Sequence, residues 1–303
     1  MGITGRKAIL FVIVSLIVVA VILSIVYTQL YGSSATRLRA ATTTSLYATG
    51  LLDYLSHHYE ASHPNVVIDY IAVGSGEALE RAARGDACIV LVHAPSLEKR
   101  YLEEGYISNH VIFAYNYFVI LGPKDDPAGV RDASNAVEAF RKIYIAGEEG
   151  RALFVSRGDR SGTNVRELMI WNMTGLDPHG KDWYLETGQG MGETLVIADE
   201  KGAYTLSDIG TYLKYELEGR LHTLTVLYTN STELINIYSA YTSTRCSSEE
   251  MGDGLQFIEW LAGSEAQSLI AEYGRGEYPH PLFYPAAGKI EYLQEAWRIL
   301  ANG

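Results

Sequence analysis

Short apolar runs alternate with amphipathic stretches along most of the chain. Residues 38–42, 66–73 and 87–92 are apolar or alternate between apolar and polar positions, a pattern typical of β-strands. The first two runs end in small polar residues and lead into stretches with helical spacing, of which residues 51–59 are the clearest example. This repeated alternation of strand and helix predicts an α/β protein with largely parallel sheets.

Two longer apolar strands divide the chain into candidate lobes. The strand predicted at residues 111–122 ends in a charged turn bracketed by prolines, residues 123–127, which we interpret as a domain boundary. Residues 236–242 predict a strand that returns the chain to the first lobe. We therefore expect one lobe to be inserted into the other. The expected boundaries are 1–35 for an N-terminal segment, 36–121 plus 238–303 for lobe 1, and 122–237 for lobe 2.

The N-terminal segment contains an apolar stretch long enough to cross a membrane. Residues 8–27 carry no charge and directly follow Arg6 and Lys7. At about 1.5 Å per helical residue, such a stretch spans the roughly 30 Å hydrocarbon core of a bilayer. The basic pair predicts a cytoplasmic N-terminus, with the rest of the chain outside the cytoplasm. A cleavable signal peptide is the alternative, with residues 33–35 as its cleavage site, although its apolar core would normally be shorter.

Composition narrows the classes of ligand. The chain has 303 residues and a formal net charge of −12, which argues against binding to nucleic acid or to an anionic membrane surface. Any bound anion must therefore be held by local dipoles, because the long-range field repels it. Two cysteines, Cys88 and Cys246, are too few for a disulfide framework, and the sequence leaves open whether they pair.

Four predicted strand-to-helix junctions are rich in glycine and hydroxyl side chains. They lie at residues 42–45, 74–76, 157–163 and 188–192. The free N–H groups of a first helical turn, the hydroxyls and the guanidinium of Arg157 can all bind the same anion. In an open α/β sheet such junctions meet at the carboxyl ends of the strands. Because nearly all of these groups donate hydrogen bonds, the pattern favours a fully deprotonated oxyanion.

Some of these residues also have simpler interpretations. Ser161 is suited to be an ordinary helix N-cap. We expect Asp159 to orient an arginine or cap the turn, and His93 to be a packed or hydrogen-bonded loop residue. The clustered histidines at 57, 58 and 63 fit a solvated helix end better than a metal site. Signatures of hydrolases, P-loop proteins and zinc proteases are absent, so we expect no enzyme and no cofactor.

Several stretches of the chain match a known family. They include Ala41-Thr42-Thr43-Thr44-Ser45, Ala72-Val73-Gly74-Ser75-Gly76, Leu91-Val92-His93-Ala94-Pro95, residues 157–163 and Gly188-Gln189-Gly190-Met191-Gly192. Through them the chain resembles the tungstate-binding proteins of ABC importers, within the periplasmic-binding-protein-like receptors for oxyanions. The resemblance extends over residues 39–285.

This resemblance implies a type II binding fold, in which two α/β lobes joined by crossing strands close on a dehydrated tetrahedral oxyanion. It also implies a set of ion-binding residues, carried over position by position. They are Thr43, Thr44, Ser45, Ser75, Gly76, Arg157, Ser161, Gly162 and Thr163. The chain departs from the family at Asn164, where a histidine usually follows the threonine.

The implied function is that of an extracytoplasmic receptor, which delivers tungstate to the permease and ATPase subunits of an ABC importer. We expect a monomer anchored by its N-terminal helix at the outer face of the cytoplasmic membrane, with no nucleic-acid partner. Molybdate is nearly the same size and shape as tungstate, so the residues alone do not decide between them. A membrane-tethered oxyanion sensor, or a receptor for another oxyanion such as phosphate, is the alternative.

Overall fold

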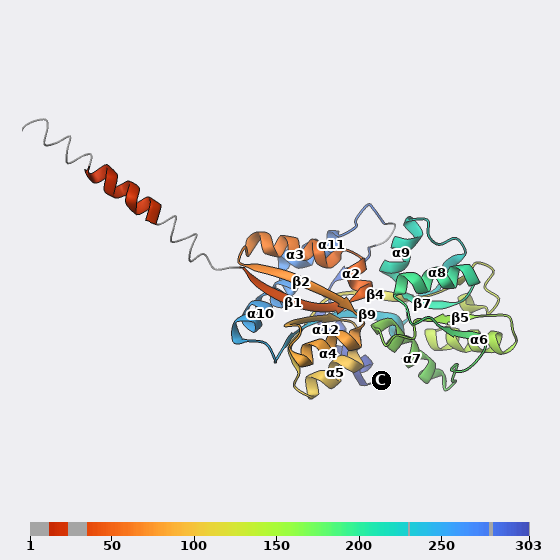
Figure 1. Cartoon of the computed structure of the whole chain (residues 1–303). Helices are drawn as coiled ribbons and strands as arrows, with labels where there is room; N and C mark the ends of the chain where they lie inside the picture. The colour runs from red at the N-terminus through yellow and green to blue at the C-terminus, as the bar shows by residue number, and fades with distance from the viewer. Residues whose placement is uncertain (1–11, 24–34, 230, 279–280, 303) are drawn as a thin grey trace, which may run out of the picture. The chain divides into compact units, whose positions relative to one another are not determined.

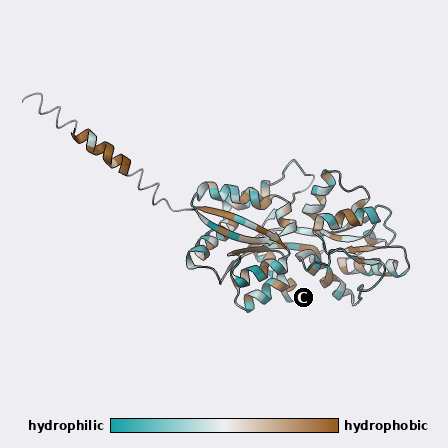
Figure 2. Cartoon of the chain, viewed as in Figure 1, coloured by the Kyte–Doolittle hydropathy of each residue, from teal (hydrophilic) through white to brown (hydrophobic). Residues whose placement is uncertain are grey.

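The computed structural model describes residues 12–23, 35–229, 231–278 and 281–302. The chain forms two units, Met1–Thr36 and Arg37–Gly303. In the first unit, residues 12–23 are helical and their large apolar side chains are exposed (Figure 2). Among the described residues, no helix is long and apolar enough to cross a membrane. The rest of the apolar stretch predicted at residues 8–27 lies outside the described residues.

The second unit alternates strands and helices (Figure 1). Its strands are β1 (Thr36–Thr43), β2 (Val66–Val73), β3 (Ile89–Val92), β4 (Ile107–Pro123), β5 (Phe154–Ser156), β6 (Tyr184–Glu186), β7 (Thr205–Asp208), β8 (Leu224–Tyr228), β9 (Ile235–Ser243) and β10 (Tyr284–Pro285). Its α-helices are α2 (Thr44–Ala48), α3 (Leu51–Ser62), α4 (Ser75–Arg84), α5 (Pro95–Glu103), α6 (Ala136–Glu148), α7 (Gly162–Thr174), α8 (Met191–Lys201), α9 (Ile209–Leu217), α10 (Ser248–Ala262), α11 (Ser264–Glu272) and α12 (Ile290–Asn302). Two short 3-10 turns, Val130–Asp132 and Thr232–Leu234, complete the set.

The main sheet is mixed rather than largely parallel. Its strands follow the order β10-β4-β9-β3-β1-β2, and β7 and β8 also pair with β4. The pairs β1–β3 and β5–β6 are parallel, but β9 is antiparallel to both β3 and β4. The prediction of largely parallel sheets was wrong because strand–helix alternation does not reveal the direction of the two long strands that pass between the ends of the unit.

Strand β4 pairs with different strands along its two halves. Its first part, up to Tyr117, pairs with β9 and β10, whereas Phe118–Leu121 pair with β7. The pairing of β4 with β8 shifts register between Ile120 and Leu121, which marks a local irregularity in the strand. Strands β4 and β9 therefore connect two groups of elements, as the sequence pattern of two long strands indicated. The exact lobe boundaries remain a prediction.

Helices cover the sheet according to their apolar faces. Helix α3 turns Leu51, Leu52, Leu55 and Tyr59 inward, and all four side chains are buried. Figure 1 shows α3 and α11 on one side of β1 and β2, and α4 and α5 on the other. Figure 2 shows apolar residues along the strands and polar residues on the outward sides of the helices. A separate core forms around Trp171, beneath α6 and α7.

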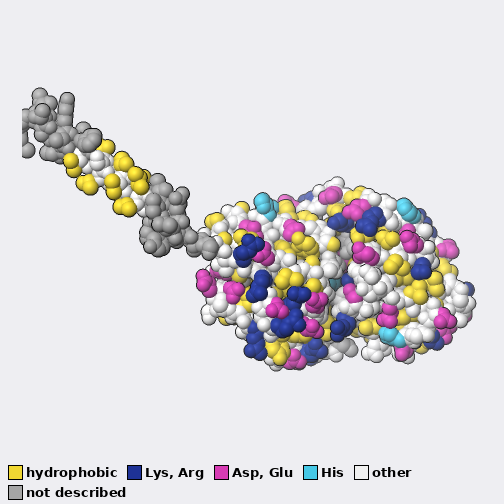
Figure 3. All heavy atoms as spheres, viewed as in Figure 1, with side chains coloured by type: hydrophobic (Ala, Val, Ile, Leu, Met, Phe, Trp, Pro, Cys, Tyr) yellow, Lys and Arg dark blue, Asp and Glu magenta, His cyan; other side chains and the backbone are white. Residues whose placement is uncertain are grey.

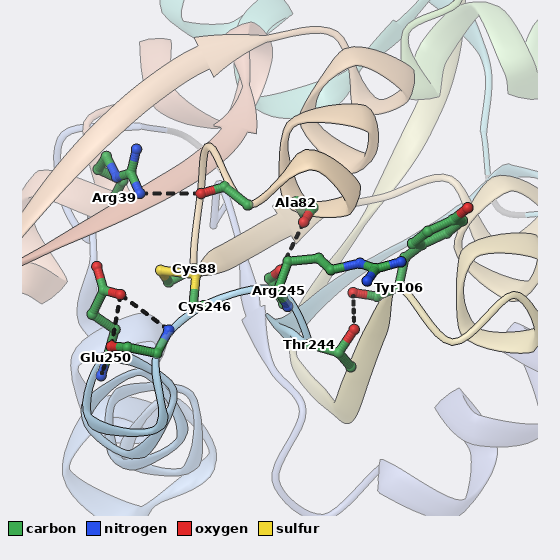
Figure 4. Close-up of a disulfide and its surroundings, with 11 residues drawn as sticks. Arg39, Ala82, Cys88, Tyr106, Thr244, Arg245, Cys246 and Glu250 are labelled. Atoms are coloured by element: carbon green, nitrogen blue, oxygen red, sulfur yellow. Dashed lines mark hydrogen bonds between the residues drawn. A yellow bond between two sulfur atoms is a disulfide. The ribbon is translucent and has the colours of Figure 1, made fainter.

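A disulfide joins Cys88, directly before β3, to Cys246, two residues before α10 (Figure 4). The two cysteines are 158 residues apart in sequence, and their Cα atoms are 5.6 Å apart. The backbone of Cys88 is held on both sides, since its N–H donates to Arg39 O and its carbonyl accepts from Ser243 N. The pairing that the sequence left open is therefore present in the structure.

Candidate oxyanion site

The predicted site residues gather where β1, β2 and β5 end. Arg157 follows β5, and its Nη2 atom donates to Thr44 Oγ1, directly after β1, at 3.5 Å. Gly74, directly after β2, faces the same loop, because a Cβ atom built there would lie 3.8 Å from the Cα of Ser161. The structure thus brings together three of the four glycine- and hydroxyl-rich junctions, of which residues 157–163 lie more than 80 residues after the other two in sequence.

The threonine run forms a tight turn of hydroxyl groups. Thr43 is the N-cap of α2, and its Oγ1 accepts from the N–H of Leu46 at 3.3 Å. The Oγ atom of Ser45 lies 3.4 Å from Thr43 Oγ1 and 3.5 Å from Nε2 of His93. Thr43 and Ser45 are buried, whereas Thr44 is half-buried. Their hydroxyl protons can therefore be directed at a ligand in the space beside Arg157.

Asp159 organises the Arg157 loop. Its Oδ2 pairs with Arg157 Nη2 at 2.5 Å, and its Oδ1 accepts from the N–H of Ser161 at 3.0 Å. The carboxylate thus orients the arginine and also closes the turn, so both roles expected of Asp159 are confirmed. Asp159 pairs with one nitrogen of the guanidinium, and the other two, Nε and Nη1, have no partner among the described residues.

Ser161 caps helix α7, as the simpler interpretation of this residue predicted. Its Oγ accepts from the N–H of Asn164 at 3.3 Å. The amide groups of Gly162 and Thr163 belong to the first turn of the helix, where the backbone N–H groups have no partner within the helix. The cap and an anion site are compatible, because the capping hydroxyl and the first-turn amides occupy the same end of α7.

Asn164 lies behind the loop. Its Oδ1 accepts from the N–H of Arg160 at 3.0 Å, and its Nδ2 donates to Ser156 Oγ at 3.3 Å. Both ends of the amide are thereby used within the loop. At the position where the chain departs from the family, the Asn164 amide thus holds the loop through its oxygen and one of its two N–H groups.

The glycine-rich stretch 188–192 supports Arg157 through the backbone. Gly188 N–H donates to the carbonyl of Arg157 at 2.8 Å, and the hydroxyl of Thr187 donates to the same oxygen at 3.3 Å. Gly192 packs against Tyr215, whose hydroxyl would lie 1.8 Å from a Cβ atom at this position. These glycines therefore have a structural explanation, in addition to the anion-binding one that the sequence suggested.

Four buried donor atoms of the candidate site have no hydrogen-bond partner in the described part of the chain. They are Ser75 Oγ, Arg157 Nε, Arg157 Nη1 and Thr163 Oγ1. Only three other buried side-chain atoms of the described residues share this property, on Tyr59, Ser231 and Glu233. An unsatisfied buried donor costs about 1–3 kcal/mol, and more when charged. An anion with several acceptor oxygens would satisfy these donors together.

His93 borders the site as a neutral, immobilised residue. Its ring lies against those of Phe118 and Tyr238, with centroid distances of 6.0 and 5.1 Å, and its Nδ1 is 2.8 Å from Asn236 Oδ1. Burial lowers the pKa of His93 to about 4. The expectation of a packed, hydrogen-bonded histidine is confirmed. The partner Asn236 was not anticipated, since it is 143 residues away and no local motif marks it.

A groove of about 500 Å³ opens beside the site. It is lined by residues of the junctions at 74–76 and 157–163. Its positive and negative side chains are equal in number: Arg84, Arg100 and Arg160, and Glu77, Glu80 and Asp159. Figure 3 likewise shows basic and acidic side chains interspersed over α4 and α5. The candidate site therefore relies on local donors, as the net charge required.

Comparison with known proteins places the chain in a family. Residues 31–265 match the PBP superfamily domain. The chain is 37% identical over 253 residues to the tungstate-binding protein TupA of Peptoclostridium acidaminophilum, with 82% of this chain and 85% of that protein aligned. The chain belongs to the TupA family within the PBP superfamily. The family resemblance predicted from the sequence is thus confirmed.

Solved structures of TupA-family relatives agree with the fold. The tungstate ABC transporter protein from Geobacter sulfurreducens is 38% identical and superposes with a TM-score of 0.67, over 78% of this chain and 98% of that one. The tungstate-binding protein TupA from Desulfovibrio alaskensis is 36% identical, with a TM-score of 0.69 over 83% of this chain and 99% of that one. These relatives are described as a tungstate ABC transporter and a tungstate-binding protein, in agreement with the expectation that the chain is not an enzyme.

Proposed function

We propose that this TupA-family chain is the extracytoplasmic substrate-binding component of an ABC importer and that it binds tungstate. The observation that carries the proposal is the set of four buried, unpartnered donor atoms on Ser75, Arg157 and Thr163. The names of relatives more than 35% identical over most of the chain support tungstate as the ligand.

The chemistry of the donors fits a fully deprotonated, tetrahedral oxyanion. Such an ion offers only acceptors, and the proposed ligands are hydroxyls, backbone N–H groups and one guanidinium: Thr43, Thr44, Ser45, Ser75, Gly76, Arg157, Ser161, Gly162 and Thr163. The carboxylate that contacts Arg157, that of Asp159, accepts hydrogen bonds from Arg157 and from the N–H of Ser161. Hydrogen bonds to a charged group contribute about 1.5–3 kcal/mol each, so several of them support tight binding after the cost of association.

Binding is proposed to close two lobes about the ion. Lobe 1 comprises residues 36–121 and 238–303, and lobe 2 comprises residues 122–237. Strands β4 and β9, which pair along most of their length, connect the two and supply the hinge. In this scheme Arg157 and α7 approach the threonine run and Ser75 when the lobes close.

The proposed partners are the permease subunits of the importer and, through them, its cytoplasmic ATPase. The receptor is proposed to act as a monomer outside the cytoplasm, held by its uncharged N-terminal stretch. That stretch follows a basic pair, which favours an outward-facing receptor. Membrane fractionation of the full chain before and after a carbonate wash tests the anchor, and release of the intact protein by the wash would contradict it.

Isothermal titration of the purified chain tests the ligand. We expect tungstate to bind far more tightly than sulfate or phosphate, and molybdate to be the nearest competitor. The same series separates the proposed function from the alternative oxyanions, because each is titrated into the same protein. Displacement of tungstate by equimolar sulfate would contradict the proposal.

A further inference from the structure

A buried glutamate lies behind the Arg157 loop. Glu167, on α7, is 2% exposed, and its carboxylate accepts three hydrogen bonds. They come from Ser156 Oγ at 2.6 Å, Tyr184 Oη at 2.6 Å and Trp171 Nε1 at 3.2 Å. Burial raises the pKa of Glu167 to about 7, so the side chain is predominantly ionised at pH 8. Three donors suit that ionised form.

Counting protons fixes the direction of each hydrogen bond in this cluster. Asn164 Oδ1 accepts from the N–H of Arg160, so the NH₂ group of Asn164 faces Ser156 Oγ, at 3.3 Å. The N–H of Gly158 also donates to Ser156 Oγ, at 3.2 Å. Ser156 Oγ therefore accepts twice, and its one proton goes to Glu167 Oε2. Glu167 must be the acceptor for this arrangement to hold.

The loop needs these anchors because its backbone is locally unfavourable. Gly158 and Arg160 both have left-handed backbone angles, with φ of 63° and 56°. For a residue with a side chain, such as Arg160, this conformation costs roughly 1–2 kcal/mol. The N–H groups of these two residues are the ones held by Ser156 and Asn164. The Glu167 cluster thus stabilises the conformation that directs Arg157 at the site.

We propose that Glu167 is a positioning residue of the oxyanion site: through Ser156 and Asn164 it fixes the loop of residues 157–161 and so aligns Arg157 with the first turn of α7. This inference rests on the proposed function for its ligand. It assigns a binding role to a side chain that does not itself reach the ion.

Two variants and their combination test the proposal by tungstate titration at pH 8. Glu167→Gln replaces the acceptor of the Ser156 proton by an amide, and we expect affinity to fall about 30-fold or more. Ser156→Ala removes only one hydroxyl, so the variant should still fold. We expect its tungstate affinity to be roughly 10-fold lower than that of the parent chain. The double variant should bind no more weakly than Glu167→Gln alone, because both changes break the same connection.

Glu98→Gln is the matched control. Glu98 is also fully buried, and it accepts hydrogen bonds from Ala94 N at 2.6 Å and from Tyr241 Oη and Trp297 Nε1 at 2.7 Å each. We expect this variant to lower the unfolding temperature about as much as Glu167→Gln while changing tungstate affinity by less than about threefold. An equal loss of affinity in both variants would show a general effect of removing a buried carboxylate and would overturn the proposal.

Amide hydrogen exchange without ligand separates this inference from the proposed function. In Glu167→Gln the amides of Gly158 and Arg160 should exchange at least about tenfold faster than in the parent chain, because their acceptors are no longer held. Unchanged exchange, or additive affinity losses in the double variant, would overturn the positioning role. Failure of the parent chain to bind tungstate would instead overturn the proposed function.

Discussion

The guanidinium of Arg157 is buried, yet only one of its three nitrogens has a hydrogen-bond partner among the described residues. The side chain is 2% exposed, its Nη2 contacts Asp159 and Thr44, and its Nε and Nη1 have no partner in the described part of the chain. A buried charge that is only partly paired is costly, so its retention at this position favours a ligand that completes the pairing. At the scale of single residues, the proposed function depends most on this side chain.

Replacing Arg157 with alanine should reduce tungstate affinity by at least about 1,000-fold, because the charge and several hydrogen bonds are lost together. The unfolding temperature should change little, because the buried guanidinium of the parent chain lacks hydrogen-bond partners at Nε and Nη1 among the described residues and so contributes little to stability. Titration calorimetry and thermal unfolding measure the two effects. Arg298→Ala, an exposed arginine of α12 paired with Glu295, serves as the control and should bind normally. Unchanged affinity of Arg157→Ala would remove this residue from the site.

His93 offers a prediction that needs no ligand. Its folded-state pKa is lowered from 6.5 to about 4 by burial, so the ring should stay neutral at pH 5.5. The amide nitrogen of Asn236 donates to Asn116 and Tyr238, so its Oδ1 atom is the one that faces His93. This oxygen accepts a hydrogen bond from the Nδ1–H group of His93. Long-range ¹H–¹⁵N spectra of the histidine rings should therefore show a neutral Nδ1–H tautomer, and a charged His93 ring at pH 5.5 would contradict this.

The lowered pKa of His93 also determines how its contribution to the free energy of unfolding changes with pH. A histidine whose pKa is depressed in the folded state contributes stability above the unfolded value of about 6.5, and this contribution is lost as pH falls toward 4. The His93 contribution should consequently fall across this interval as the unfolded chain takes up a proton, whereas Glu167, whose pKa burial raises to about 7, contributes with the opposite sign. The difference between the parent chain and His93→Gln isolates the His93 contribution. Unfolding monitored at pH 7 and pH 5 gives the comparison.

At the scale of secondary-structure elements, the N-terminal end of α7 approaches His93 closely only because residue 162 is a glycine. A Cβ atom there would lie 2.8 Å from Nε2 of His93, whose ring is held by Phe118 and Tyr238 and has little freedom to move. Backbone approach of this kind is a common reason for glycine at a binding site. The contact connects α7 to the residue that follows β3.

Gly162→Ala should therefore weaken tungstate binding by roughly 10-fold or more, because the helix end must withdraw from His93. Gly252→Ala in α10 is the matched control, since no atom lies within 4 Å of a Cβ at that position. The control should bind normally and gain up to about 1 kcal/mol in stability, as expected for alanine in a helix. Equal affinity of Gly162→Ala and the parent chain would contradict a tight approach in the bound state.

The sequence predicted the positions of most elements and the junctions that come together in the candidate site, and the structure explains what it could not predict. Local periodicity located β4, β9 and the amphipathic helices, but sheet direction depends on contacts between distant segments, so the mixed topology was missed. Glycine and hydroxyl motifs marked the site because they are continuous in sequence. Asn236 and Glu167 carry no such motif, and their roles follow only from side chains brought together by folding.

At the scale of the whole molecule, the disulfide is a long-range constraint. It closes a loop of 158 residues between Cys88 and Cys246, and a loop of this length restricts the unfolded chain by roughly 5 kcal/mol in the chain-entropy description. Most of the second unit, including β4 through β9, lies within that loop. Stability of the fold should therefore depend on an oxidising environment.

The double variant Cys88→Ala/Cys246→Ala should unfold at a clearly lower temperature than the oxidised parent, by an amount consistent with a loss of up to about 5 kcal/mol. Tungstate affinity at 25 °C should remain within about threefold, because neither cysteine belongs to the proposed site. The reduced parent chain provides a second comparison without a change of sequence. Equal unfolding temperatures in all three would rule out a stabilising role for the bond.

The position of this bond also determines what a protease can release. Any single cut between residues 89 and 245 divides the chain into two fragments that each retain one of the bonded cysteines. A receptor nicked in an exposed loop, such as the turn at residues 123–127, thus remains one covalent molecule with all of its proposed ligands. Such a nick becomes visible as two bands only after reduction, so a single proteolytic cut need not abolish the function of the receptor.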